Sequence, residues 1–136
     1  MKSHRVDREA RWVGQPGQDI GLIFAANATF SQFYFLDLNT DNRTFALYRH
    51  NSNGSVATEI PPTVTISVQP GTTSNLIRVE RSATQMWLIV NHDIVAVRTF
   101  DPAFNGMTYV GLAAAPYAGT PSAEARFGGF SVVPRP

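Results

Sequence analysis

Short stretches of alternating apolar and polar residues, each closed by glycine, proline, asparagine or aspartate, repeat along most of the chain. Side chains on a β-strand point to opposite faces with a period of two, so this alternation predicts strands with one buried face. Helical periodicity is almost absent. The pattern therefore predicts an all-β, two-sheet antiparallel sandwich. The expected strands are 6–13, 19–26, 33–38, 44–50, 64–68, 75–81, 85–90, 94–100, 109–114 and 124–133.

The connections between these strands predict two local pairings. Residues 39–42 are Asn-Thr-Asp-Asn, whose side chains readily cap turns, so strands 33–38 and 44–50 should form a hairpin. The three strands between residues 75 and 100 are joined by short polar turns. These three strands should form a meander.

Proline and glycine pairs mark two irregular segments. Residues 51–63 contain Asn53-Gly54 and Pro61-Pro62, so this segment either crosses between the sheets or runs along a sheet edge. Gly128-Gly129 interrupts the last strand. A glycine pair inside a strand predicts a bulge or a bend.

Alternation also predicts which side chains are buried. Ile77 and Val79 should face the core, with Arg78 on the outer face. By the same rule Trp87 and Ile89 lie on the outer face, where a large apolar pair needs a partner, a ligand or a covering loop. The predicted buried residues are Ile77, Val79, Met86, Leu88, Val90, Phe127 and Phe130.

Length and composition narrow the class further. A chain of 136 residues is the usual size of one domain, so residues 1–136 are predicted to form a single domain. Its charged fraction is 15% and its net charge is +1, which gives no long-range field to attract nucleic acid or a membrane surface. No apolar run approaches about 18 residues, and the N-terminus lacks the pattern of a secretion signal. We therefore expect a soluble domain with neither nucleic-acid binding nor membrane insertion.

A series of short strings, in order along the chain, resembles laminin-G-like and concanavalin A-like jelly-roll domains. The first half contributes Gly21-Leu22-Ile23-Phe24 and Phe33-Tyr34-Phe35-Leu36. The second half contributes 75–81 (Asn-Leu-Ile-Arg-Val-Glu-Arg), 88–92 (Leu-Ile-Val-Asn-His), 110–113 (Val-Gly-Leu-Ala) and 125–130 (Ala-Arg-Phe-Gly-Gly-Phe). The resemblance covers about residues 6 to 133 and implies a jelly-roll sandwich of the kind common in glycan-active proteins.

This sequence departs from the family pattern at three places. His92 stands where the family usually has a turn glycine, and Gly128 stands where it often has aspartate, so no metal contact carries over. Such domains usually have strand material before the segment resembling 6–13, so the resemblance implies that an N-terminal strand is missing. A missing strand would leave an exposed edge at strand 6–13, which predicts a homodimer that pairs this edge.

The sequence contains few groups that could carry out catalysis. The acidic E-x-D-x-E strand motif of jelly-roll glucanases is absent, so no acid and nucleophile pair is assigned. The three histidines, His4, His50 and His92, are not at metal-ligand spacing, and there is no cysteine. Asp37, Asn39 and Asp41 begin like a calcium loop, but Tyr48 occupies the position of its bidentate glutamate. We predict no catalytic residue, no metal and no cofactor.

The remaining candidates are aromatic residues with polar neighbours, which suit sugar recognition. Sugar C–H faces stack on aromatic rings, and sugar hydroxyls form hydrogen bonds with Arg, Asn and Asp. A non-catalytic module that binds an oligosaccharide or glycoconjugate is therefore the leading hypothesis. A protein-interaction domain that assembles through a sheet edge is the alternative, followed by a small glycoside hydrolase. The candidate ligand-binding residues are Asp37, Tyr48, Arg49, Arg78, Trp87 and Asn91.

Overall fold

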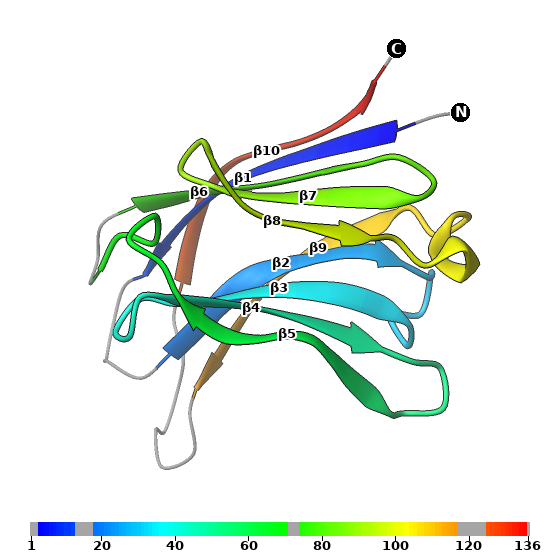
Figure 1. Cartoon of the computed structure of the whole chain (residues 1–136), viewed down its shortest axis with the longest axis horizontal. Helices are drawn as coiled ribbons and strands as arrows, with labels where there is room; N and C mark the ends of the chain where they lie inside the picture. The colour runs from blue at the N-terminus through cyan, green and yellow to red at the C-terminus, as the bar shows by residue number, and fades with distance from the viewer. Residues whose placement is uncertain (1–2, 13–17, 71–73, 117–124, 136) are drawn as a thin grey trace.

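The structure, a computed structural model, describes residues 3–12, 18–70, 74–116 and 125–135, with side chains described over 19–70 and 75–113. The described residues form strands and one short 3-10 helix, so the predicted all-β class is confirmed. Figure 1 shows the strands stacked in two layers. The elements are β1 (Ser3–Trp12), β2 (Gln18–Ala26), β3 (Phe33–Asn39), β4 (Thr44–His50), β5 (Val56–Val64), β6 (Ser74–Arg81), β7 (Gln85–Val90), β8 (Asp93–Thr99), η1 (Pro102–Phe104), β9 (Tyr109–Pro116) and β10 (Ala125–Arg135).

Two antiparallel sheets of five described strands each make the sandwich. Sheet A has the order β10-β1-β6-β7-β8, and sheet B has the order β5-β4-β3-β2-β9. The predicted β3–β4 hairpin and the β6-β7-β8 meander are both confirmed. The predicted bulge is also present, because Arg8 and Glu9 pair with Phe130 and Gly128, which leaves Gly129 as the extra residue.

The core lies between the sheets and is made by the inward side chains of alternate positions. From sheet A it takes Ile77, Val79, Met86, Leu88 and Val90, all fully buried as predicted. Phe127 and Phe130 lie outside the described side chains. Sheet B contributes the corresponding inward rows, and the 93–104 segment closes one end with two aromatic rings. These residues are Ile20, Leu22, Phe24, Tyr34, Leu36, Leu38, Phe45, Leu47, Phe100 and Phe104.

The prediction that the first strand lies at an exposed edge is wrong. β1 is hydrogen-bonded to β10 on one side and to β6 on the other, so both of its sides are paired within the sheet. The described edges are instead β10 and β8 in sheet A, and β5 and β9 in sheet B. The strand that covers β1 comes from the other end of the chain, which local pattern reasoning does not connect to it. The argument for a dimer through β1 therefore no longer holds.

The segment after Asn51 forms β5, which runs along the edge of sheet B, and the predicted strand 64–68 is not formed. Pro61 and Pro62 lie in this edge strand, where a missing N–H is tolerated. Beyond Val64 the chain turns away because side chains hold its carbonyl groups. The guanidinium of Arg43 donates to the carbonyl oxygens of Val68 and Ile66 at 2.8 and 2.7 Å, and Asn91 Nδ2 donates to that of Ser67 at 2.7 Å.

Candidate functional site

The outer face of sheet B has a hollow between β2, β3, β4 and β5. Along β3 the residues Leu36 and Leu38 point into the core, so Phe35 and Asp37 point outward. Asp37 lies opposite Ala46, and Phe35 lies opposite Tyr48. The volume of the hollow is about 300 Å³, at the small end for a small-molecule site. Its lining residues are Asp19, Asp37, Asn39, Asn42, Thr44, Ala46, Tyr48 and Pro62.

Asp19 and Asp37 meet in this hollow because of the register between β2 and β3. Gly21 pairs with Asp37 and Asp19 pairs with Asn39, so the two aspartates are diagonal neighbours on the outer face. The site needs a glycine at position 21. A Cβ atom there would overlap the carbonyl oxygen of Leu36 and lie 2.6 Å from Cε1 of Phe35. Gly21 therefore gives the Phe35 ring room on the outer face beside Asp37.

The two carboxyl groups form a proton-sharing pair. Burial, the charge of Asp19 and a hydrogen bond with Asp19 together raise the pKa of Asp37 to about 8, with burial as the largest cause. Asp37 is 8% exposed, and its Oδ1 is buried without a hydrogen-bond partner. Near neutral pH the Asp37 carboxyl therefore keeps its proton and donates a hydrogen bond to the Asp19 carboxylate. The pKa of the Tyr48 hydroxyl is raised by burial first, then by Asp37 and Asp19.

The Asn39 side chain, another polar group of the hollow, is engaged in hydrogen bonds with the β3–β4 turn. Asn39 Oδ1 accepts hydrogen bonds from the backbone N–H groups of Asp41 and Asn42, at 3.0 and 3.1 Å. The turn then passes through Arg43, whose φ of 55° is left-handed. Asn39 thus shapes the rim of the hollow, and Asp37 and Tyr48 remain as its inner polar groups.

An aromatic row continues from the hollow along the same face. Phe33 and His50 are opposite each other, and their rings stack with centroids 4.2 Å apart. Partial burial lowers the pKa of His50, so its imidazole is neutral over more of the pH range. The neighbouring cross-strand pair is Phe35 and Tyr48. The outer face of sheet B therefore carries a row of aromatic side chains next to the acidic hollow.

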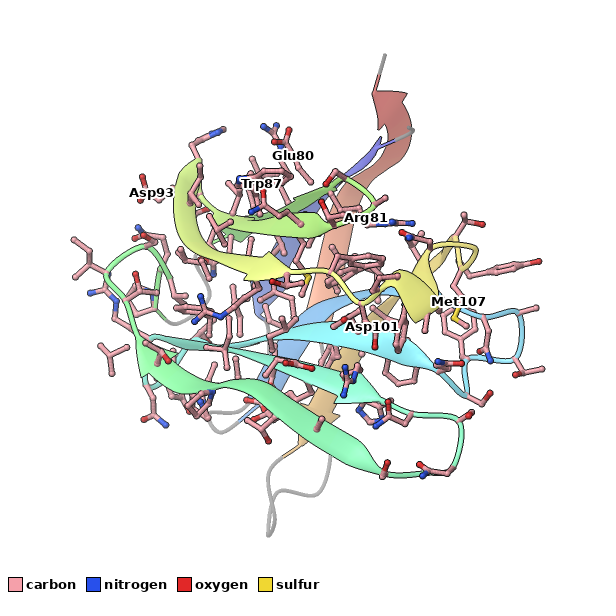
Figure 2. The ribbon with its side chains drawn as sticks, turned by 45° about the vertical axis from the view of Figure 1, so that its right-hand side comes forward. Glu80, Arg81, Trp87, Asp93, Asp101 and Met107 are labelled. Atoms are coloured by element: carbon pink, nitrogen blue, oxygen red, sulfur yellow. The ribbon has the colours of Figure 1, made fainter. Side chains whose placement is uncertain are left out.

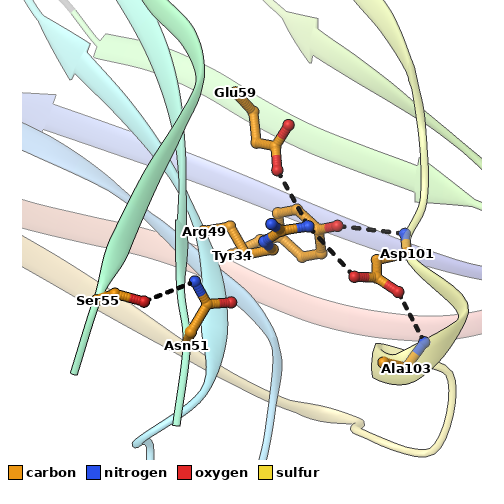
Figure 3. A network of polar contacts seen from close by, with 7 residues as sticks. All are labelled: Tyr34, Arg49, Asn51, Ser55, Glu59, Asp101 and Ala103. Atoms are coloured by element: carbon orange, nitrogen blue, oxygen red, sulfur yellow. Dashed lines mark hydrogen bonds and ion pairs between the residues drawn. The ribbon is translucent and has the colours of Figure 1, made fainter. Parts of the chain in front are cut away.

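Arg49 lies on the inward side of β4, away from this surface. Its Nη1 is 3.3 Å from Glu59 Oε1 and 3.2 Å from Asp101 Oδ2 (Figure 3). Asp101 is fixed by two more hydrogen bonds, since its N–H donates to the Tyr34 hydroxyl and its Oδ1 accepts from the N–H of Ala103. Arg49 therefore connects sheet B to the segment that follows β8, through its ion pair with Asp101.

Asn91 is held inside a network of the β7–β8 turn. Its Oδ1 accepts from the N–H of Leu76 at 2.8 Å, and its Nδ2 donates to Ser67 O and to Asn75 Oδ1. Asn91 and His92 have φ values of 50° and 73°, the left-handed pair that a tight two-residue hairpin requires. All the polar atoms of the Asn91 amide are thus engaged in joining the turn to the chain after β5.

Trp87 and Arg78 lie on the outer face of sheet A, on the opposite side of the sandwich from the hollow. Trp87 is paired with Glu80 on one side and Val97 on the other. Figure 2 shows Trp87 and Glu80 together above the upper layer, away from Asp101 and Met107 at the end of the sandwich. Ile89, which shares this face, is only 7% exposed.

The six predicted ligand-binding residues therefore do not form one site. Only Asp37 and Tyr48 come together, and the structure adds Asp19, which sequence reasoning missed. Its signal was present, because Asp19 precedes the alternating Ile20 and Leu22 at an outward position. Among the described residues, no three His, Asp or Glu side chains gather as metal ligands. No helix in that part of the chain is long and apolar enough to cross a membrane.

Comparisons with solved structures show the same fold in proteins of very different sequence. Sheep galectin-11 in complex with glycerol has a TM-score of 0.72 at 8% identity, covering 96% of this chain and 90% of that one. The carbohydrate-binding module CBM66 from Bacillus subtilis has a TM-score of 0.70 at 10% identity, covering 97% and 75%. Alginate lyase A1-II' in complex with its substrate has a TM-score of 0.65 at 14% identity, covering 97% and 60%.

No family model and no curated protein matches the sequence. The jelly-roll fold implied by the sequence resemblance is nevertheless confirmed, and it is of the concanavalin A-like type. At identities of 8–14% these likenesses concern the fold alone.

Proposed function

We propose that this chain is a non-catalytic module that binds carbohydrate in the hollow on the outer face of sheet B. The observation that carries the proposal is the juxtaposition there of the buried Asp37 carboxyl, with one oxygen lacking a partner, and the half-buried ring of Tyr48. Buried polar atoms without partners are rare in folded proteins. A ligand that supplies a donor to Asp37 and an apolar face to the ring would meet both needs.

A sugar has this combination of groups. Its hydroxyls donate and accept hydrogen bonds, and its C–H faces contact aromatic rings. The lining residues Asp19, Asn42 and Thr44 offer further polar atoms around the pair. The lining residues that the structure describes include no Arg, Lys or His, and this lining disfavours acidic sugars such as the alginate acted on by the lyase.

The fold comparisons support this class without assigning a ligand. One of the similar structures is a carbohydrate-binding module, and galectins recur among the others. Jelly-roll sandwiches host several functions, so the proposal depends on the hollow itself. We also propose that residues 1–136 act as one domain, in line with the 96% of the chain covered by galectin-11.

The carboxyl pair does not favour glycoside hydrolysis by the two-carboxylate mechanisms. Retaining enzymes hold their acid and nucleophile about 5–5.5 Å apart, and inverting enzymes hold them further apart. Asp19 and Asp37 are joined by a hydrogen bond, which leaves no room for a sugar carbon or a water between them. Their geometry suits recognition of a donor better than cleavage.

Nuclear magnetic resonance titration tests the proposal. Amide shifts of ¹⁵N-labelled protein should move around Asp37, Ala46 and Tyr48 when mono- and oligosaccharides are added at millimolar concentration. Tyr48→Ala should weaken binding at least about tenfold, which corresponds to about 1.4 kcal/mol. Trp87→Ala is the matched control, because it removes a half-buried ring from the other sheet. Absence of any shift, or shifts confined to sheet A, would contradict the proposal.

Self-association is a second candidate, favoured by the edge strand β8. Its outward residues Ile94 and Val97 are 61% and 42% exposed, and Val97 lies beside Trp87. An edge with exposed apolar side chains can pair with a second copy through a two-fold axis. Sedimentation at micromolar concentration should show a dimer that Ile94→Lys dissociates. A monomer at all concentrations would remove this candidate.

A further inference from the structure

Resting on the proposed function, we infer that the Asp19–Asp37 pair selects a sugar carrying a primary ammonium group, an amino sugar, over neutral and acidic sugars. The chemistry recognised is a compact cation with several N–H donors next to hydroxyl groups. The inference specifies the ligand class of the hollow, and it can fail while carbohydrate binding itself stands.

One oxygen of the Asp37 carboxyl lacks a hydrogen-bond donor. Asp37 is more than nine-tenths buried, lines the hollow, and has one oxygen without a partner. The neighbouring Asp19 is also an acceptor when ionised. An ammonium group has three N–H donors and no acceptor, so one such group can donate to both carboxyl groups. A sugar hydroxyl brings a single donor and no positive charge to the pair.

The charges around the pair also favour a cation. The described groups facing Asp37 are Asp19 from β2, Asn39 at the end of β3, Asn42 of the β3–β4 turn, Thr44 and the Tyr48 hydroxyl from β4, and Pro62 from β5. Arg43 is close in sequence, but it directs its guanidinium to the Val68 and Ile66 carbonyls. No described cation therefore balances the two carboxyl groups.

A divalent metal ion suits the hollow less well than an ammonium group. Calcium takes six to eight oxygen ligands, and the described residues gather no third carboxylate here. Asn39 Oδ1, the next oxygen, already accepts two backbone hydrogen bonds. The two carboxyl groups, with few other free oxygens near them, supply enough acceptors for an ammonium group but too few ligands for calcium.

Binding of such a ligand is coupled to a proton. The Asp19–Asp37 pair holds one proton near neutral pH, because the pKa of Asp37 is raised and the two carboxyl groups share a hydrogen bond. The pair therefore carries one negative charge. When the ammonium enters, this proton leaves to solvent, and the cation then interacts with two carboxylates. Affinity should therefore rise as pH increases from 6 towards 7, by up to about tenfold, because the amine keeps its own proton over this range.

Isothermal titration with a matched set of monosaccharides tests the inference. Glucosamine, N-acetylglucosamine, glucose and glucuronate share one ring and differ in charge and donors. We expect glucosamine to bind at least tenfold more tightly than glucose at pH 7, and glucuronate to bind weakest. The measured heat should change with the ionisation enthalpy of the buffer, because a proton is released. The shape of the ring contact alone would not produce that dependence.

Variants of Asp19 and Asp37 test whether this pair causes the preference for glucosamine. Asp37→Asn and Asp19→Asn should each abolish the preference for glucosamine over glucose and the buffer dependence of the heat. Glu80→Gln, which removes an acid from the outer face of sheet A, should change neither. Circular dichroism confirms that each variant is folded. Retained preference in Asp37→Asn would overturn the inference.

Two further ligands test whether the hollow recognises an amino sugar, an ammonium group alone or a metal ion. Ethanolamine carries the ammonium and a hydroxyl without the ring, and binding as tight as that of glucosamine would overturn the assignment to a sugar. Calcium chloride that displaces glucosamine would overturn it in favour of a metal site. Equal affinities for glucosamine and glucose would overturn the inference and leave the proposed function intact. If none of the sugars binds, the proposed function itself falls.

Discussion

The outer face of β6 in sheet A alternates opposite charges, Arg78 and Glu80, beside the ring of Trp87. The outer face of sheet B instead places two acids, Asp19 and Asp37, against each other with no described cation lining the hollow. Interspersed charges of both signs are what a solvated surface uses. A like-charged buried pair costs stability, and such costs concentrate at functional sites. The difference supports our proposal that the binding site lies on sheet B, although both sheets carry aromatic side chains.

The largest expected effect comes from the glycine beneath the hollow. Gly21→Ala should destabilise the protein by about 3 kcal/mol, because its Cβ overlaps backbone of Leu36 and forces the strands to shift. Gly106→Ala is the control, since a Cβ there meets nothing within 4 Å. Chemical denaturation compares the two variants. Equal stability of both would mean that the outer face of sheet B tolerates extra volume.

The next effect is on stability as a function of pH. The pKa of Asp37 is about 8 in the folded protein, against an ordinary value of 3.8. Between these two pH values the folded state therefore holds a proton that the unfolded state has lost. Stability should therefore be greatest below pH 4 for this group and fall as pH rises to 8. Asp37→Asn should flatten this slope and stabilise the protein by about 2 kcal/mol at pH 8.

Denaturation midpoints at pH 5, 6.5 and 8 measure this effect. The matched change on sheet A, Glu80→Gln, should leave the slope of the parent protein unchanged. A slope that persists in Asp37→Asn would place the responsible group elsewhere and remove the contrast between the two faces.

A smaller effect compares one ring from each face. Tyr48→Ala should lower sugar affinity at least about tenfold, and Trp87→Ala should lower it less than twofold, because only Tyr48 lines the hollow. Titration followed by tyrosine and tryptophan fluorescence measures both. If loss of Trp87 has the larger effect, the binding face is that of sheet A.

The smallest effect lies in the β7–β8 turn of sheet A. His92 has a φ of 73°, a conformation that glycine adopts without steric cost. His92→Gly should stabilise the protein by about 0.5–1 kcal/mol and leave sugar binding unchanged. Thermal unfolding and titration test the two parts separately. Weaker sugar binding in this variant would assign the imidazole a contact that the geometry does not support.

Much of the local structure follows from the sequence alone. The strands 44–50 and 85–90 and the inward positions Ile77, Val79 and Leu88 agree with the alternation of apolar residues. A strand alternates its faces every two residues, so neighbouring positions carry enough information to assign them. The turn residues at 39–42 likewise specify a hairpin, because turn chemistry is local.

Only the tertiary structure decided which strands are neighbours. β1 lies between β6 and β10, whose residues are distant from it in sequence, and this pairing removed the predicted edge. The predicted strand 64–68 was lost because Arg43 and Asn91 bind its carbonyl groups. Asp19 and Asp37 meet through the β2–β3 register, whereas Arg49 turns inward to Glu59 and Asp101. Residue types indicate which chemistry is available, but a site depends on distances across strands, and those are set by the packing of the whole sandwich.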